Sequence, residues 1–159
     1  MFLVKRSVQA AMMMIMFFSF SAFAVDDAVN TGRFNSIAID GYDTVAYFTQ
    51  NKAVEGDKAF KVKWRDAYWY FNSKENKALF EAEPEKYAPQ YGGWCAYAMA
   101  DEGSTARIDP DAFHIYENKL YLNYSKSINE KWLKDKLTMI KDADHYYPLE
   151  TDVNSFIQK

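Results

Sequence analysis

Residues 60–71, Phe-Lys-Val-Lys-Trp-Arg-Asp-Ala-Tyr-Trp-Tyr-Phe, contain the pattern that decides the fold. Apolar and cationic side chains alternate over residues 60–65, and this period of two indicates a strand with one buried and one solvent-facing side. Residues 65–67 then predict a turn, and the aromatic run 68–71 returns as the partner strand. The stretch therefore predicts an antiparallel β-hairpin.

A second hairpin and two helices are predicted further along the chain. Residues 113–116 and 120–124 flank the polar residues 117–119 and resemble the first hairpin in pattern. Ser73 is the expected N-cap of one helix, and a capping box at Ser127 and Glu130 opens the longest helix. Residues 94–99 fit either a short helix or a buried strand. This order of elements predicts an α+β fold, in which a small antiparallel sheet of two hairpins is covered by helices and a long C-terminal helix follows.

The first 24 residues have the pattern of a cleaved signal peptide. Lys5 and Arg6 precede an apolar stretch at residues 10–18, and the small-x-small sequence of residues 22–24 provides a cleavage site before Val25. The apolar stretch is shorter than the ~20 residues that a membrane span needs. We therefore expect export to the periplasm, with no membrane anchor after cleavage.

Composition and charge narrow the organisation of the rest of the chain. No internal repeat is evident, so we expect one domain, at residues 37–147. The preceding residues 25–36 are expected to form a flexible lead-in, and residues 148–159 a peripheral tail. The net charge of −3 and the scattered lysines argue against a nucleic-acid-binding protein. The single cysteine excludes an intramolecular disulfide.

That cysteine, Cys95, lies within a cluster of glycines and aromatic residues at positions 87–99. Gly92 and Gly93 allow a tight turn or the close approach of another group, because neither has a Cβ. Trp94 and Tyr97 are expected to form the wall of a pocket. The predicted ligand-binding residues are therefore Gly92, Gly93, Trp94 and Tyr97.

Cys95 itself has two interpretations. A free cysteine commonly packs as a small buried apolar residue. A reactive cysteine needs a lowered pKa, which a helix N-terminus, a cation or a histidine can provide. In a metal site, Cys95, Met99 and His114 would supply a thiolate, a thioether and an imidazole, a set that suits copper. The alternative is that Met99 fills the core and His114 faces solvent.

The sequence lacks the common motifs of catalysis. It contains no glycine-rich phosphate loop, no His-Glu-x-x-His and no Gly-x-Ser-x-Gly. A hydrolase or a nucleotide-dependent enzyme is therefore unsupported, and a non-catalytic protein is favoured.

Several stretches resemble the YHS domain family. Residues 40–48, Asp-Gly-Tyr-Asp-Thr-Val-Ala-Tyr-Phe, are similar to the opening segment of that family. Residues 70–87 resemble its strand, helix and closing Pro-Glu-Lys-Tyr. Residues 91–96 and 119–123 are similar to a longer, exported branch of YHS-domain proteins. The resemblance covers residues 37–147.

The resemblance implies a metal-binding domain whose ligands are cysteines. In this chain the matching positions are Ala46, Asn72 and Asn76. An amide has neither the charge nor the polarizable sulfur of a thiolate, so the usual metal site of the family is expected to be absent. Any metal ion would need other ligands, such as those near Cys95.

Three hypotheses about function remain open at this point. The first is an exported YHS-like binding module that holds a copper-like metal ion or a small ligand near Cys95. The second is a structural or interaction domain in which Cys95 is buried. The third is a redox protein whose single thiol is oxidised to a sulfenic acid and resolved by another molecule. The oligomeric state and the partner are left open.

Overall fold

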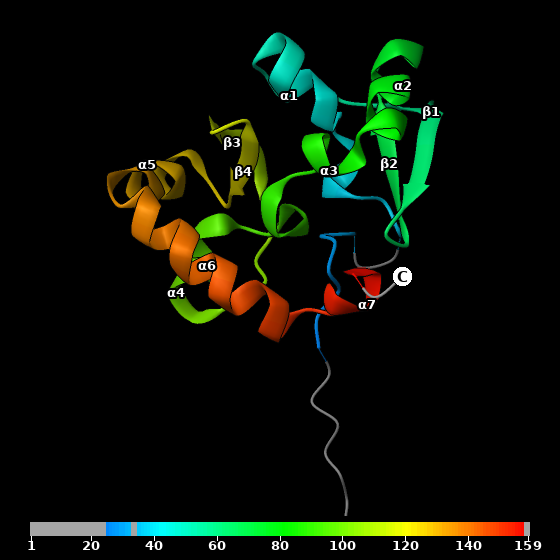
Figure 1. Ribbon diagram of the computed structural model, residues 1–159. Helices are drawn as coiled ribbons and strands as arrows, with labels where there is room; N and C mark the ends of the chain where they lie inside the picture. The colour runs from blue at the N-terminus through cyan, green and yellow to red at the C-terminus, as the bar shows by residue number, and fades with distance from the viewer. Residues whose placement is uncertain (1–24, 33–34, 158–159) are drawn as a thin grey trace, which may run out of the picture.

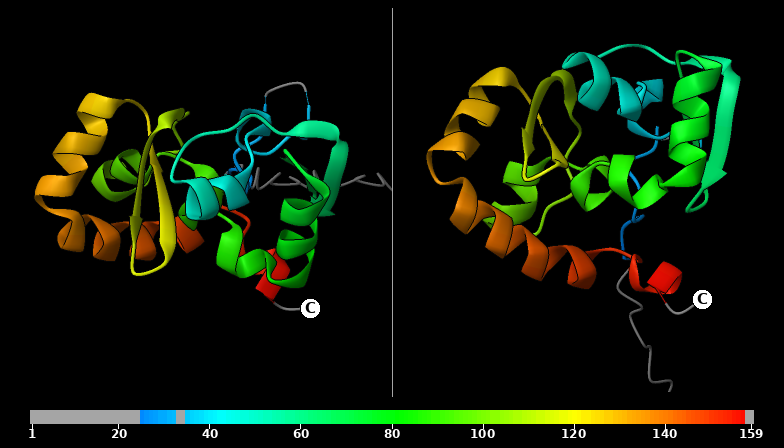
Figure 2. Two further views of the ribbon diagram at one scale, coloured as in Figure 1. Left: turned by 90° about the horizontal axis from the view of Figure 1, so that it is seen from above. Right: turned by 45° about the horizontal axis from the view of Figure 1, so that its top comes forward.

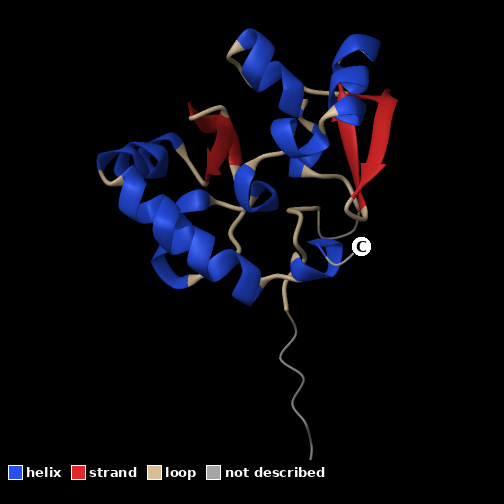
Figure 3. Ribbon diagram, viewed as in Figure 1, coloured by secondary structure: helices blue, strands red, loops and turns tan. Residues whose placement is uncertain are grey.

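Two antiparallel hairpins packed against helices confirm the α+β fold (Figures 1 and 3). The computed structural model describes residues 25–32 and 35–157, so the expected signal peptide lies outside the described residues. One hairpin pairs β1 (Asp57–Trp64) with β2 (Ala67–Phe71), and the other pairs β3 (Asp109–Tyr116) with β4 (Lys119–Asn123). They form two separate two-stranded sheets, whereas the sequence predicted one sheet.

Short helices surround the hairpins, and a long helix follows them. The helices are α1 (Thr44–Gln50), α2 (Lys74–Ala82), α3 (Pro84–Tyr87), α4 (Ala96–Glu102), α5 (Lys126–Lys134), α6 (Lys136–Glu150) and α7 (Asn154–Ile157), with the 3-10 helices η1 (Ile39–Gly41) and η2 (Gln90–Gly93). The long C-terminal helix is α6. It is separated from α5 by Asp135, whose backbone is not helical. No helix among the described residues is both long and apolar enough to cross a lipid bilayer.

The same order of elements occurs twice, and the second copy lies 52 residues after the first. Thr44 and Ala96 begin α1 and α4, Asp57 and Asp109 begin β1 and β3, and the copies end with α2 and α5, which have equal lengths. We call residues 39–82 unit 1 and residues 91–134 unit 2. Figure 1 shows them as two lobes, and the views in Figure 2 agree. The expectation of no internal repeat is therefore wrong.

Local details of the two hairpins also match. In each, the regular pairing is interrupted after the first residue of the longer strand, between Asp57 and Lys61 in unit 1 and between Asp109 and Phe113 in unit 2. Both turns contain two consecutive residues with positive φ. A serine that follows the second strand, Ser73 or Ser125, caps the next helix in both units, so the expected capping box at Ser127 is wrong. Two hairpins that share a turn, an irregularity and a cap have the same backbone design.

Side chains at equivalent core positions are similar in size but differ in identity. Trp69 stacks on Phe80 at 5.3 Å between ring centroids, and the equivalent Tyr121 lies 5.0 Å from Trp132. All four rings are buried. Only five equivalent positions of the two units are identical, namely Gly41/Gly93, Ala46/Ala98, Asp57/Asp109, Ser73/Ser125 and Lys74/Lys126. This low identity explains why the repeat is not evident in the sequence.

The N-terminal residues 25–32 are bound to the rest of the protein, in contrast to the expected flexible lead-in. The Asn30 amide donates to the Gly92 carbonyl at 3.0 Å, and its side chain donates to the Gly93 carbonyl at 2.9 Å. The Tyr147 hydroxyl donates to the Ala28 carbonyl at 2.6 Å. We call residues 26–30 the clamped segment.

Residues 151–153, which follow α6, also contribute to holding the clamped segment. The Ala28 amide donates to the Asp152 carboxylate at 2.7 Å, and the Asp152 amide donates to the Asp26 carbonyl at 3.0 Å. Thr151 and Val153 are buried. The expected peripheral tail is therefore in part a packed element.

We predict that Gly92→Ala destabilises the protein more than Gly41→Ala. Both glycines have positive φ, so either substitution costs about 1–2 kcal/mol in backbone strain. A Cβ on Gly92 would lie 1.7 Å from the Ala28 carbonyl oxygen, whereas one on Gly41 would lie 3.4 Å from the nearest atom, on Tyr70. The displaced backbone adds about 2 kcal/mol to the cost at Gly92. Urea denaturation measures both free energies of unfolding, and equal losses would contradict the prediction.

Candidate functional site

Cys95 is buried at the N-terminus of α4. Its side chain is 1% exposed and belongs to the core cluster that includes Trp69 and Leu122. The sulfur accepts a hydrogen bond from the Tyr124 amide at 3.2 Å. Burial raises the pKa of the thiol, and hydrogen bonds from backbone amides oppose this rise in part. The thiol is therefore protonated at neutral pH and shielded from solvent, which are the properties of an inert cysteine.

The repeat explains why a cysteine occupies this position. Its equivalent in unit 1 is Asp43, a fully buried residue whose carboxylate caps α1. One carboxylate oxygen of Asp43 accepts from the Val45 and Ala46 amides at 2.9 and 3.1 Å, and the other accepts from the Asn72 amide at 2.8 Å. Asn72 is equivalent to Tyr124, so sulfur and carboxylate accept the same backbone amide in the two units.

In unit 2 two side chains, Cys95 and Asn123, have the capping role that Asp43 has alone in unit 1. The Asn123 amide oxygen accepts from the Tyr97 amide at 3.0 Å, a donor equivalent to Val45, and lies 3.7 Å from the Cys95 sulfur. The Asn123 amide nitrogen donates to Asn129 at 2.9 Å. Sequence reasoning missed Asn123, although a polar residue in an otherwise apolar strand was a usable signal. Asn123 and Cys95 together complete a buried, hydrogen-bonded cap.

The positions at which the resemblance implies cysteines hold a hydrogen-bond network instead. Asn76 donates through its side chain to the Asp43 carboxylate at 2.8 Å and to the Asn72 side chain at 3.1 Å. Ala46 is fully buried beside them. This donor set satisfies a carboxylate and contains no thiolate, so it does not suit a soft metal ion.

The three residues of the expected metal site lie in different surroundings. Met99 packs in a second core cluster with Tyr121 and Trp132, apart from the cluster that holds Cys95. The His114 ring lies 6.1 Å from the Trp132 ring, and burial together with the positive charge of Lys136 lowers its pKa. Within the described residues, no three His, Cys, Asp or Glu side chains form a group that could hold a metal ion.

The four expected ligand-binding residues also have different roles. The close approach that Gly92 and Gly93 permit is made by the chain itself, since Ala28 and Ile39 occupy the space beside them. Tyr97 packs against both core clusters. Trp94 lines an open cavity and donates through its indole nitrogen to the Asp27 carbonyl at 2.8 Å.

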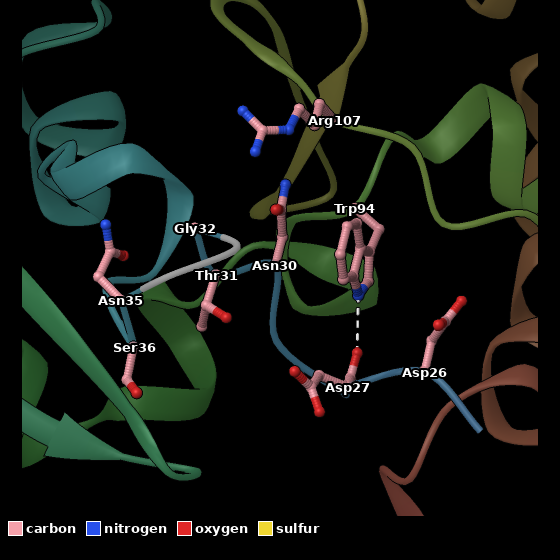
Figure 4. A pocket seen from close by; sticks show the side chains of 9 residues that line it. All are labelled: Asp26, Asp27, Asn30, Thr31, Gly32, Asn35, Ser36, Trp94 and Arg107. Atoms are coloured by element: carbon pink, nitrogen blue, oxygen red, sulfur yellow. Dashed lines mark hydrogen bonds between the residues drawn. The ribbon is translucent and has the colours of Figure 1, made fainter. Parts of the chain in front are cut away.

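This cavity has a volume of about 700 Å³ and is shown in Figure 4. It lies between the clamped segment, the chain that leads into η1, and unit 2. Its lining is polar except for the Trp94 ring, and consists of Asp26, Asp27, Asn30, Thr31, Gly32, Asn35, Ser36, Trp94 and Arg107. The volume is in the range of small-molecule sites, which is about 300–1,000 Å³.

Charged groups of opposite sign lie on different sides of the cavity. Arg107 extends from one side, and the carboxylates of Asp26 and Asp27 lie on the other (Figure 4). The ion pairs found among the described residues involve neither Arg107 nor these two aspartates. Among the described residues, no ion pair neutralises these charges, and one oxygen of the Asp26 carboxylate accepts a hydrogen bond from the Thr105 hydroxyl.

Comparison with known proteins found no family model, no curated protein and no solved structure that matches this chain.

We predict that Cys95 reacts slowly with iodoacetamide in the folded protein. Because the thiol is buried and its pKa is raised, we expect a rate at least about 100-fold below that of the urea-unfolded chain, with reaction limited by local opening. Ser104→Cys in a Cys95→Ser background provides an exposed thiol for comparison. Labelling of Cys95 at the rate of this control would support the redox hypothesis instead.

We also predict that His114 titrates below its ordinary pKa of 6.5. The unfolded state then binds more protons than the folded state below that pH, so the contribution of His114 to stability falls as the pH drops through this window. Proton NMR measures the pKa directly, and His145→Gln assigns the two histidine signals. Lys136→Gln removes the neighbouring cation and should raise the pKa of His114. A pKa at or above 6.5 would contradict this prediction.

Proposed function

We propose that this chain is an exported, YHS-like, non-catalytic binding module whose ligand is a small polar molecule held in the cavity beside Trp94. The observation that carries the proposal is the cavity itself, which combines a suitable volume, one aromatic wall and charged side chains that form no ion pair with another described residue. Ligand sites commonly join such a wall to a few polar groups that fix orientation.

The clamped segment, which forms one side of the cavity, is held in place by hydrogen bonds before any ligand binds. Asp27 is bonded to Trp94, Ala28 to Tyr147 and Asn30 to the Gly92-Gly93 turn. A site with a fixed backbone loses little conformational entropy on binding. This supports a binding role for the surface that these residues form.

The bonding of Cys95 supports the small-ligand version of the module over the copper and redox versions. The sulfur accepts an amide hydrogen bond in the core, and a buried protonated thiol is a poor metal ligand and a poor nucleophile. Cys95 thus has a structural role in the proposal, and the YHS-like part of the proposal rests on the sequence resemblance alone.

A thermal-shift screen of residues 25–159 tests the proposal. The probes are free amino acids, monosaccharides and dicarboxylic acids, and a probe present at 100 times its Kd stabilises the protein by about 2.7 kcal/mol. We expect at least one probe class to raise Tm, and Trp94→Ala and Arg107→Ala to abolish the rise.

The repeat provides matched controls for these variants. Tyr42 and Glu55 are the unit 1 equivalents of Trp94 and Arg107, and neither lines the cavity. Tyr42→Ala and Glu55→Ala should therefore keep the response to the probe. The proposal fails if no probe raises Tm, or if the unit 1 variants lose the response as fully as the unit 2 variants do.

A further inference from the structure

We infer that the ligand of this cavity is a zwitterion, a small molecule that carries both a carboxylate and an ammonium group, as free amino acids do. The inference rests on the proposed function, because it names the ligand class of the same site. It follows from the position of charges of opposite sign on different sides of one cavity (Figure 4).

Arg107 is the group that recognises the carboxylate. It is exposed and belongs to none of the ion pairs among the described residues. In Figure 4 its guanidinium extends over the cavity from the side opposite the aspartates. A guanidinium binds a carboxylate through two parallel hydrogen bonds, a geometry that an amide or a hydroxyl cannot reproduce.

Asp27 and Asp26 recognise the ammonium group from the other side. The backbone carbonyl of Asp27 is fixed by the Trp94 indole, and Asp27 lines the cavity on the side away from Arg107. Asp26 accepts a hydrogen bond from Thr105 at 2.5 Å, which restrains the second carboxylate. The Trp94 ring lies beside them, and the face of an indole also attracts a cation.

Ligands with a single charge are disfavoured by the same arrangement. An anion that pairs with Arg107 brings its negative charge into a cavity that already contains two carboxylates. A cation that pairs with Asp27 leaves Arg107 without a partner and adds a repulsive charge. A zwitterion satisfies both sides at once, so its specificity comes partly from repulsion of the alternatives.

Isothermal titration calorimetry on residues 25–159 tests this inference with the twenty free amino acids as probes. Each binder is compared with its α-amide, which lacks the carboxylate charge, and its N-acetyl form, which lacks the ammonium charge. We expect each derivative to bind at least about tenfold more weakly, since each loses a hydrogen-bonded charge pair.

Two variants assign the two ends of the ligand. Arg107→Gln should abolish the preference for the free acid over its α-amide and keep the preference over the N-acetyl form, while Asp27→Asn should do the reverse. Glu55→Gln, the unit 1 equivalent of the arginine change, should alter neither ratio. These ratios compare two ligands on one protein, so a change in stability alone does not move them.

The outcomes separate the inference from the proposed function. If a sugar or a dicarboxylic acid binds at Trp94 and Arg107 while no amino acid does, the cavity is a binding site and the zwitterion class is wrong. Equal affinity for an amino acid and for both of its derivatives would also overturn the class. If no probe of any class binds, both conclusions fall together.

Discussion

The approach of the clamped segment to the Gly92-Gly93 turn is the contact on which the rest of the structure depends. A single Cβ on Gly92 would occupy the place of the Ala28 carbonyl oxygen. The equivalent position in unit 1 is Asp40, which also has a positive φ and whose side chain is exposed. The two units therefore differ where the N-terminal segment binds, and this difference places Asp27 and Asn30 beside Trp94 to form the cavity.

Duplication changes the interpretation of the single cysteine. In isolation, a lone thiol within glycines and aromatic residues invites a chemical role. Comparison with the equivalent residue, Asp43, shows that both side chains have the same role. Each accepts hydrogen bonds from backbone amides at the start of a buried helix. Unit 1 uses a carboxylate with two asparagines around it, and unit 2 uses a sulfur with Asn123.

Much of the local structure could be predicted from the sequence, and the long-range structure could not. The alternation at residues 60–65 and the Ser73 cap depend on near neighbours, so both hairpins and the helix after the first were found. The second helix was predicted only in outline, because its cap is Ser125 and Asp135 divides the expected single helix into α5 and α6. The repeat was missed because pairs such as Phe80 and Trp132 share only volume and burial. The N-terminal residues looked loose because their partners, Tyr147 and Asp152, lie far away in sequence. For the same reason Trp94 was identified as a pocket residue, while Arg107 and Asp27 were not.

The pairing of Asp26 with residues 150–152 brings the two ends of the described chain together. Each unit is built from local contacts, which form early because short loops cost little entropy. The clamped segment has partners in η2, α6 and the residues after α6, so it can dock only when nearly the whole chain is present. We therefore expect chain closure to be the last step of folding. The cavity has that segment as one wall, so it forms only when the clamped segment has docked.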